Sequence, residues 1–335
     1  MMKGMRILLA LVAVLALAAG LVAVAASRNL GPFDRPALGG NVFAERALFT
    51  DPANRTLQAA GRMEAEGRPE DAAILREMAA VPSGIWLTPE EYPPGRVDQY
   101  VVSVVQKSEA ADEIPVFVLY GIPDRDCSGG FSAGGLEADG YRPWVEEIAE
   151  SVLDVRAGDN VAVVVEPDAL ASSLECGNRD ERVRLVGQAV DVLASAGITT
   201  YVDAGHSDWV SVDEMASMLE EVGIDRVRGF STNVSNYQTD EAELAYAERL
   251  DRALGGGTHW VVDRGRNGNG ATEEWCNPPG RALGRLPGFV DDGTGLDAYL
   301  WVKPPAESDG TCNLGPQAGE VYLDQALAMA RAAGW

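Results

Sequence analysis

The sequence has few of the residues that usually bind zinc, and its basic residues are far outnumbered by acidic ones. It has two histidines, His206 and His259, and four cysteines without a C-x-x-C pair, so the usual zinc ligand sets are missing. Lys and Arg number 27 against 51 Asp and Glu, which gives a formal net charge of −24 over 335 residues. Such a surface repels phosphate backbones and anionic membranes. We therefore expect no nucleic-acid partner, and a neutral substrate fits this charge better.

The signatures of several common enzyme classes are also missing. The sequence contains no P-loop, no G-x-G-x-x-G between a strand and a helix, and no G-x-S-x-G nucleophile elbow. It shows no obvious internal repeat and no Ser/Thr/Pro-rich linker. These absences argue against nucleotide-dependent enzymes, esterases of the α/β-hydrolase type and an appended binding module.

Residues 1–26 are typical of an export segment. Lys3 and Arg6 precede an apolar run that ends in small residues. This pattern predicts a cleaved signal peptide, while its length of about 20 residues also allows a retained N-terminal membrane anchor. Both alternatives place the rest of the chain outside the cytoplasm, as a secreted or membrane-anchored protein.

The four cysteines agree with an exported protein. An even number of cysteines outside the cytoplasm predicts disulfide bonds, and four cysteines allow three pairings. They lie as two pairs that are separate in sequence, so the simplest pairing joins Cys127 to Cys176 and Cys276 to Cys312.

A short tether over residues 27–40, with two prolines and three glycines, precedes one predicted domain over 41–335. From residue 83 onward, short apolar runs alternate with longer helical patterns, and Gly197 and Gly223 follow two of the helical patterns, where C-cap glycines are expected. The apolar runs are Gly84–Leu87, Ile114–Tyr120, Val161–Glu166, Ile198–Asp203, Arg226–Ser231, His259–Asp263 and Ala298–Lys303. The alternation predicts a parallel sheet. Seven strands with right-handed crossovers favour a barrel-like closure, with a doubly wound open sheet as the alternative.

Polar side chains follow six of these runs at the point where each strand ends. They are Asp126 and Ser132 after Tyr120, then Glu166 and Asp168, Asp203 and His206, Asn233, the group Asp263, Arg266 and Asn267, and finally Lys303, Glu307 and Asp309. An aspartate after a strand is often only a turn or capping residue. However, the carboxyl ends of parallel strands share one edge, and active sites form there. Six strands that deliver polar groups therefore favour a site.

The expected site is rich in carboxylates and poor in other nucleophiles. Glycoside hydrolysis needs one carboxylic acid that protonates the leaving oxygen and a second group that handles the water. An oxygen-ligated Mg²⁺ or Ca²⁺ site is the alternative, although we expect no metal and no cofactor. Trp86, Trp209 and Trp275 lie at strand ends or in loops, where an indole packs against a sugar face, whereas Trp301 lies inside a strand and is expected in the core.

Seven stretches together resemble glycoside hydrolase family 6, which includes endoglucanases and cellobiohydrolases. They are YGIPDRDCSGGFSAGG, VVVEPDAL, YVDAGHSDW, STNVSNY, RNGNG, WCNPPGRALG and DAYLWVKPPAESDG. The resemblance implies an α/β fold, namely a distorted seven-stranded parallel β/α barrel of TIM-like type, with an active-site cleft at the C-terminal ends of the strands. It further implies metal-independent hydrolysis of β-1,4 bonds with inversion at the anomeric carbon.

The resemblance also implies catalytic roles for five residues. Asp168 matches the catalytic acid, and Asp126 matches the aspartate that raises the acid's pKa and takes part in moving a proton from the attacking water. Tyr120 matches the tyrosine that crowds the distorted sugar, and Ser132 matches the serine that helps to hold the water. Asp309 matches the aspartate proposed as base, a role that is disputed.

Other positions are implied to bind substrate, and the family's disulfides match the local pairing given above. With Trp86 from the aromatic pattern, the expected substrate-binding residues are Trp86, Asp203, His206, Trp209, Asn233, Trp275, Lys303 and Glu307. Ala306 departs from a common family glycine, and it would strain the Asp309 loop if that position needs a positive φ.

Short loops favour an open cleft. The segment from Gly284 to Asp297 and the stretch after Asp168 are short, whereas exo-acting relatives have longer loops that roof the cleft. The sequence therefore predicts a monomeric endo-1,4-β-glucanase that acts on β-1,4-glucan chains. The alternatives are an exo-acting cellobiohydrolase of the same family and an inactive carbohydrate-binding homologue.

Overall fold

The computed structural model describes residues 40–155 and 157–335. The predicted signal peptide or anchor over 1–26 lies outside the described residues, as does nearly all of the tether over 27–40. Within the described ranges, no helix is long and apolar enough to cross a membrane. The division into export segment, tether and main domain therefore stays a prediction.

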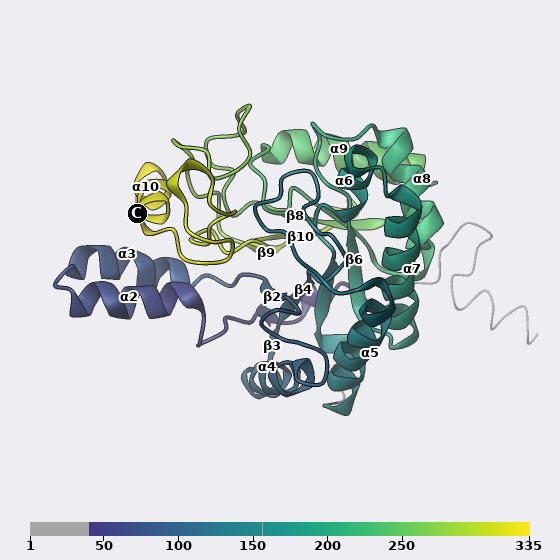
Figure 1. The fold of residues 1–335 in the computed structure, drawn as a ribbon, viewed down its shortest axis with the longest axis horizontal. Helices are drawn as coiled ribbons and strands as arrows, with labels where there is room; N and C mark the ends of the chain where they lie inside the picture. The colour runs from purple at the N-terminus through teal and green to yellow at the C-terminus, as the bar shows by residue number, and fades with distance from the viewer. Residues whose placement is uncertain (1–39, 156) are drawn as a thin grey trace, which may run out of the picture. The chain divides into compact units, whose positions relative to one another are not determined.

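One eight-stranded sheet forms the centre of the described fold (Figure 1), with the strand order β2-β4-β5-β6-β7-β8-β10-β9. The strands are β2 (Ile85–Leu87), β4 (Val116–Leu119), β5 (Ala162–Val165), β6 (Thr199–Asp203), β7 (Gly229–Thr232), β8 (His259–Asp263), β9 (Gly288–Phe289) and β10 (Leu296–Leu300). All neighbours pair in parallel except β9, which pairs antiparallel with β10. The seven parallel strands correspond to the seven predicted apolar runs, and β9 is an addition.

The run Ile114–Tyr120 divides into two strands. Glu113–Ile114 forms β3, which pairs with β1 (Ala47–Leu48) in a separate two-stranded sheet, and Val116 begins β4. Pro115 lies between them and has no N–H to donate to a ladder. The proline therefore marks the point at which the chain changes sheets.

The main sheet curls into a distorted barrel, as predicted, rather than an open doubly wound sheet. Inward side chains from β4, β5, β6, β8 and β10 form one buried cluster, so strands far apart in the strand order meet. Where the sheet comes round, Gly84 N–H donates to Trp301 O at 2.9 Å, and Trp86 Nε1 donates to Val302 O at 2.9 Å. A Cβ on Gly84 would lie 2.3 Å from Val302 O, so this close approach requires glycine.

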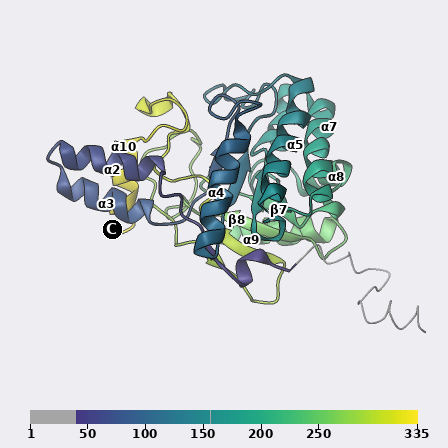
Figure 2. The same ribbon diagram turned by 90° about the horizontal axis from the view of Figure 1, so that it is seen from below.

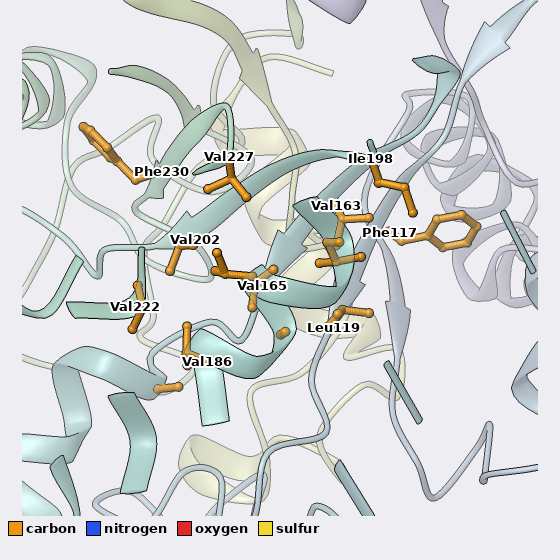
Figure 3. Packing of buried hydrophobic residues seen from close by; sticks show 14 of the residues in the cluster. Phe117, Leu119, Val163, Val165, Val186, Ile198, Val202, Val222, Val227 and Phe230 are labelled. Carbon is orange, nitrogen blue, oxygen red and sulfur yellow. The ribbon is translucent and has the colours of Figure 1, made fainter. Parts of the chain in front are cut away.

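Helices cover the outer face of the sheet (Figure 2). They are α4 (Val97–Ala111), α5 (Ala138–Asp154), α7 (Arg179–Ser195), α8 (Val212–Val222) and α9 (Asp240–Ala253). Strand side chains such as Phe117 and Val165 pack against helix side chains such as Val186 and Val222 (Figure 3). Full burial of each such side chain contributes about 1.5–3 kcal/mol. This packing holds the strands, and therefore their carboxyl ends, in fixed positions.

A second helical group packs beside the end of β10. It contains α2 (Arg55–Ala65), α3 (Pro69–Ala79) and α10 (Leu323–Ala332), which lie close together in Figure 1. Their apolar faces form a cluster with Trp301 and Ala306, which are each 1% exposed. Trp301 is therefore a core residue, as expected. Ala306 is absent from the residues with left-handed φ, so alanine causes no such strain in the Asp309 loop.

Candidate active site

A cleft of about 750 Å³ lies at the carboxyl ends of the parallel strands. Its lining includes the five candidate catalytic residues together with four of the expected substrate-binding residues. These are Tyr120, Asp126, Ser132, Asp168 and Asp309, and Trp86, Trp275, Lys303 and Glu307. A cleft of this size suits a small-molecule or oligosaccharide segment. The structure thus brings together nine side chains whose outermost members in sequence, Trp86 and Asp309, are 223 residues apart.

Asp168 follows β5 and directly precedes α6 (Ala169–Cys176). Its backbone has a φ of +68°, and the nearby Glu166 has a φ of +50°. Left-handed backbone at non-glycine residues costs of order 1–3 kcal/mol each, and it is found mostly where function demands a particular side-chain direction. Asp168 N–H donates to Asp203 Oδ2 at 2.9 Å. This hydrogen bond fixes the turn that carries the Asp168 carboxyl.

The surroundings of Asp168 favour its protonated form. Its Oδ1 atom is buried and has no hydrogen-bond partner among the described residues. Burial raises the pKa of Asp168 well above its ordinary value, and the negative charges of Asp203, Asp126 and Asp309 raise this pKa further, while Lys303 opposes them. A carboxyl group in this environment keeps its proton to higher pH than an exposed aspartic acid.

Asp126, Ser132 and Tyr120 form a chain of hydrogen bonds beside Asp168. Asp126 Oδ2 accepts from Ser132 N–H at 2.7 Å and from Ser132 Oγ at 3.1 Å, and Ser132 Oγ lies 2.9 Å from Tyr120 OH. Burial and the charge of Asp168 raise the pKa of Tyr120, so the phenol stays neutral. The chain places a carboxylate and two hydroxyl groups along one side of the cleft.

Arg125 braces this loop, and sequence reasoning did not single it out. Its guanidinium donates to Tyr120 O and to Ser132 O, each at 3.0 Å, and to Glu90 Oε2 at 2.9 Å. It also lies 4.9 Å from the centre of the Tyr120 ring. In the sequence, only the position of Arg125 directly before Asp126 points to a role. Its three hydrogen-bond acceptors cannot be predicted, because they lie at separate positions in the chain.

Glu166 is a second residue of the site whose function the sequence did not indicate, although its position at a strand end was recognised. It is buried, and its carboxylate accepts from Gly121 N–H at 3.0 and 3.2 Å and from Ile122 N–H at 3.2 Å. Burial raises the pKa of Glu166 to about 7, against the hydrogen bonds from Gly121, which lower it. The contact ties the loop after β5 to the loop after β4, and therefore ties Asp168 to Tyr120.

Asp309 is held on both carboxylate oxygens. Arg266 Nη1 lies 2.9 Å from Oδ1 and 3.0 Å from Oδ2, and Oδ2 also accepts from Tyr237 OH at 3.2 Å and from Asn277 N–H at 3.0 Å. Lys303 Nζ lies 3.9 Å from Oδ1. Both Arg266 and Asp309 are buried. The sequence placed Arg266 at the right edge, but it did not predict this ion pair.

Lys303, Glu307 and Trp86 form the wall next to Asp309. Lys303 Nζ donates to Ser308 O at 3.2 Å and lies 5.2 Å from the centre of the Trp86 ring, where the cation is attracted to the ring face. Burial lowers the pKa of Lys303 and raises the pKa of Glu307. The edge of the Trp86 ring system also meets the Tyr120 ring, with 5.0 Å between centroids.

Four expected substrate-binding residues are not among the residues that line the cleft. Asp203 is buried behind Asp168, where burial raises its pKa to about 7. Asn233 is buried and donates to Asp263 O at 2.8 Å. The rings of His206 and Trp209 contact each other with 5.4 Å between centroids, and burial lowers the pKa of His206 to about 4. Their roles in substrate binding stay a prediction.

The two disulfides have the predicted pairing, Cys127–Cys176 and Cys276–Cys312. The first joins the loop that carries Asp126 to the end of α6, the helix that Asp168 precedes. The second joins the residue after Trp275 to the loop that follows Asp309. Both crosslinks therefore tie together loops of the cleft. The described residues contain no group of three or more His, Cys, Asp or Glu that could hold a metal ion.

A curled parallel β/α sheet with a carboxylate-lined cleft at its carboxyl edge defines the class of barrel-type glycoside hydrolases. The chain belongs to glycosyl hydrolases family 6, whose sequence profile matches residues 43–334.

Its relatives in this family include several endoglucanases. The chain is 42% identical over 265 residues to endoglucanase A of Cellulomonas fimi, and the aligned region covers 79% of this chain and 57% of that protein. It is 37% identical over 250 residues to endoglucanase A of Thermobispora bispora, and this aligned region covers 72% of the chain and 54% of the relative. The chain therefore spans little more than half the length of these two relatives.

A solved structure shows the same fold. Endoglucanase Cel6 from Mycobacterium tuberculosis, in complex with methyl-cellobiosyl-4-deoxy-4-thio-β-D-cellobioside, superposes with a TM-score of 0.81 at 40% identity. The match covers 88% of this chain and 100% of that chain. A cellobiohydrolase of Podospora anserina is more distant, at 30% identity over 331 residues.

Proposed function

We propose that the protein is an endo-1,4-β-glucanase that hydrolyses internal β-1,4 bonds of cellulose-like glucans with inversion of configuration. The observation that carries the proposal is the position of Asp168 in a cleft large enough for an oligosaccharide, where burial and the neighbouring Asp203, Asp126 and Asp309 raise the pKa of its carboxyl. The endoglucanase relatives support the same activity, and the cello-oligosaccharide analogue bound to one of them supports the class of substrate.

In this proposal Asp168 is the general acid. It donates its proton to the glycosidic oxygen as the bond to the anomeric carbon breaks, and it must therefore be protonated at the working pH. Its raised pKa meets that need. Negative charge from the neighbouring aspartates also favours the positive charge that develops on the sugar in the transition state.

The hydrogen-bonded chain through Ser132 is suited to holding the attacking water and to accepting its proton. Ser132 Oγ can hold a water on the face of the sugar opposite the leaving group, and Asp126, which accepts from Ser132 Oγ at 3.1 Å, can receive its proton through that contact. Tyr120 lies at the other end of the chain, where its ring restricts the sugar.

Asp309 is assigned a supporting role. Arg266 lies against both oxygens of Asp309, and Oδ2 also accepts from Tyr237 OH and Asn277 N–H, so protein groups fix the carboxylate in place. We therefore assign Asp309 to the electrostatics of the cleft, as a fixed negative charge that raises the pKa of Asp168.

The lining of the cleft supports internal cutting. Residues 169–234 and 276–302, all described by the structure, contribute no side chain to the lining. These ranges contain the two short stretches that the sequence singled out, and the second contains β9, which pairs along the edge of β10. Neither stretch walls the cleft, so a long chain can enter from the side.

The proposal includes an extracellular setting. Two disulfides that join loops of the cleft fit an oxidising compartment. We propose that the chain acts as a monomer, either secreted or held by an N-terminal membrane anchor, on a neutral polysaccharide.

The test follows the viscosity of carboxymethylcellulose together with the release of reducing ends. An endo-acting enzyme lowers viscosity before many reducing ends appear. Slow thinning with cellobiose as nearly the sole product would instead favour an exo-acting enzyme. The Asp168→Ala variant is the control: if it and the wild type are equally inert while both bind cello-oligosaccharides, the protein is a carbohydrate-binding homologue.

A further inference from the structure

The loop over residues 204–209 follows β6, and we refer to it as the β6 loop. It contributes no side chain to the lining of the cleft. However, Asp203, the last residue of β6, accepts from Asp168 N–H at 2.9 Å. The groups that hold the β6 loop therefore also help to hold the backbone that carries the Asp168 carboxyl.

Backbone hydrogen bonds fix the first residues of the β6 loop. Ala204 N–H donates to Ser231 O at 2.9 Å, and Gly205 O accepts from Asn233 N–H at 2.8 Å. Gly205 N–H also donates to Asp203 Oδ2 at 3.0 Å. These bonds join the loop to β7 and the residue after it, and they fold the loop back onto Asp203.

Two side chains of α9 bind the same loop. Glu243 Oε1 accepts from Ser207 N–H at 2.9 Å, and Tyr246 OH donates to Ala204 O at 2.9 Å. Both side chains are buried. Glu243 and Tyr246 are three residues apart, so they lie on one face of the helix. The helix therefore holds the β6 loop at two points.

Glu243 is a costly residue to bury at this place. Its Oε2 atom is buried and has no hydrogen-bond partner among the described residues. Burial raises the pKa of Glu243, against the contacts from Ser207 and Thr232, which lower it. An apolar side chain would fill the same space without this cost. Buried carboxyl groups of this kind gather at functional sites, which directs attention to the contact with Ser207.

The charged groups around Glu243 lead to the general acid. Burial raises the pKa of Asp203 to about 7, and the charge of Glu243 also raises it. Burial and then the charge of Asp203 raise the pKa of Asp168. On α9 itself, burial and then Glu243 raise the pKa of Tyr246. The side chains that the adjacent α8 buries are all apolar, and Asp263 of β8 accepts from backbone N–H groups of other loops. The remaining charged groups that act on Asp168 are Asp126, Asp309 and Lys303.

We propose that Glu243 is a positioning residue for the general acid. It fixes the β6 loop through Ser207 N–H, and it thereby keeps Asp203 where it binds the backbone of Asp168. The inference rests on the proposed function, because it needs Asp168 to act as the proton donor. Glu243 itself touches no substrate in this role.

The experiment measures the pH profile of kcat/KM on cellotetraose for Glu243→Met and Glu243→Gln. Met removes both carboxyl oxygens and keeps most of the volume, whereas Gln keeps an acceptor for Ser207 N–H. When the β6 loop loosens, the charge of Asp203 moves away from Asp168, so the alkaline limb moves to lower pH. Glu243→Met should show this shift, with kcat lowered roughly tenfold to a hundredfold, because a misplacement of about 1 Å costs up to about 10²-fold. Glu243→Gln should keep the alkaline limb of the wild type.

Glu241→Met is the matched control, because it removes an exposed carboxyl group from the same first turn of α9. It should leave the profile unchanged. The double variant Glu243→Met/Asp203→Asn should have the alkaline limb of Asp203→Asn alone, since Glu243 acts through Asp203. An unmoved limb in Glu243→Met, or an equal shift in Glu243→Gln, would overturn the proposal. If Glu243→Met does not fold, Glu243→Asp takes its place, because the shorter side chain draws the carboxylate away from Ser207.

Hydrogen exchange of backbone amides separates this inference from the proposed function, because it needs no turnover. The amides of Ser207 and Asp168 should exchange about tenfold faster in Glu243→Met than in the wild type, and at the wild-type rate in Glu243→Gln. A wild type that hydrolyses no β-1,4-glucan would refute the proposed function alone. Unchanged exchange of both amides in Glu243→Met would refute the positioning role alone.

Discussion

Replacing Arg266 by Met removes the cation that holds Asp309 while it keeps most of the side-chain volume. Arg266 is 1% exposed, and its Nη1 lies 2.9 and 3.0 Å from the two oxygens of Asp309. The guanidinium also lies 4.5 Å from the centre of the Tyr237 ring. The substitution leaves a buried carboxylate without its main counter-charge, which is one of the few changes that destabilise a protein strongly.

The expected cost is about 3 kcal/mol. Removing one partner of a buried ion pair typically costs about 3–5 kcal/mol. The lower end applies here because Tyr237 OH, Asn277 N–H and, at 3.9 Å, Lys303 still face the carboxylate. For a domain of this size, about 2 °C in Tm accompanies each kcal/mol, so Tm should fall by roughly 6 °C.

The assay is unfolding in guanidinium chloride and by heat, with a surface pair as the matched control. Arg142 and Glu146 form an i,i+4 pair in which both side chains are more than two fifths exposed. Arg142→Met should therefore cost no more than about 0.5 kcal/mol. The double variant Arg266→Met/Asp309→Asn should be less destabilised than the sum of its single variants, because the unpaired charge is gone.

The account of Asp309 is refuted if Arg266→Met costs less than about 1 kcal/mol, or if the two substitutions are additive. Either result would mean that Arg266 does not hold the carboxylate as the structure describes. Asp309 would then be free to take a proton, and the base role would return.

Three further predictions concern pH and the crosslinks. Burial is the largest cause of the raised pKa of Asp168, and the charge of Asp203 is the second largest. Asp203→Asn removes that charge, so the alkaline limb of the pH profile of kcat/KM should move to lower pH. An alkaline limb at the wild-type pH would contradict this prediction. Burial raises the pKa of Glu166 from 4.5 to about 7, so its stabilising effect is full below pH 4.5 and is lost as pH rises through about 7. Denaturant titrations between pH 4.5 and about 7 should show that the free energy of unfolding of Glu166→Gln rises by up to about 3 kcal/mol relative to that of the wild type. A difference between the two proteins that does not change with pH would refute the assignment. Replacing Cys127 and Cys176 by Ser opens a link between residues 49 apart and should cost about 4 kcal/mol of unfolding free energy, with a fall in activity; an unchanged denaturation midpoint would contradict it.

The strands could be predicted from the sequence because each is a short apolar run buried on both faces. Seven runs became the seven parallel strands, and the glycines Gly197 and Gly223 have the positive φ expected after helices. The two-residue strand β9 could not be found, since Gly288–Phe289 is too short to form a pattern. Its pairing depends on β10, which lies beside it only in the folded chain.

The site was predictable in its location more than in its contacts. The strand ends and motifs identified four carboxylates that line the cleft, Asp126, Asp168, Glu307 and Asp309, but sequence position does not say which way a side chain turns. Asp203 is the last residue of β6, and Asp168 follows β5 by three residues, yet Asp203 turns to accept from Asp168 N–H and Gly205 N–H. The hydrogen bond from the backbone of the β6 loop to the carboxylate on α9 left no local signal, because its two residues lie 36 positions apart in sequence.

The central claim, that Asp168 is the general acid, is tested most directly by comparing two substrates in Asp168→Asn. Cellotetraose has a poor leaving group that needs protonation, whereas 2,4-dinitrophenyl β-cellotrioside has a leaving group that departs without it. The account predicts that kcat on cellotetraose falls by roughly 10²–10⁴-fold, while kcat on the activated substrate stays within about tenfold of the wild type. Equal losses on both substrates would show that Asp168 does something other than donate the proton.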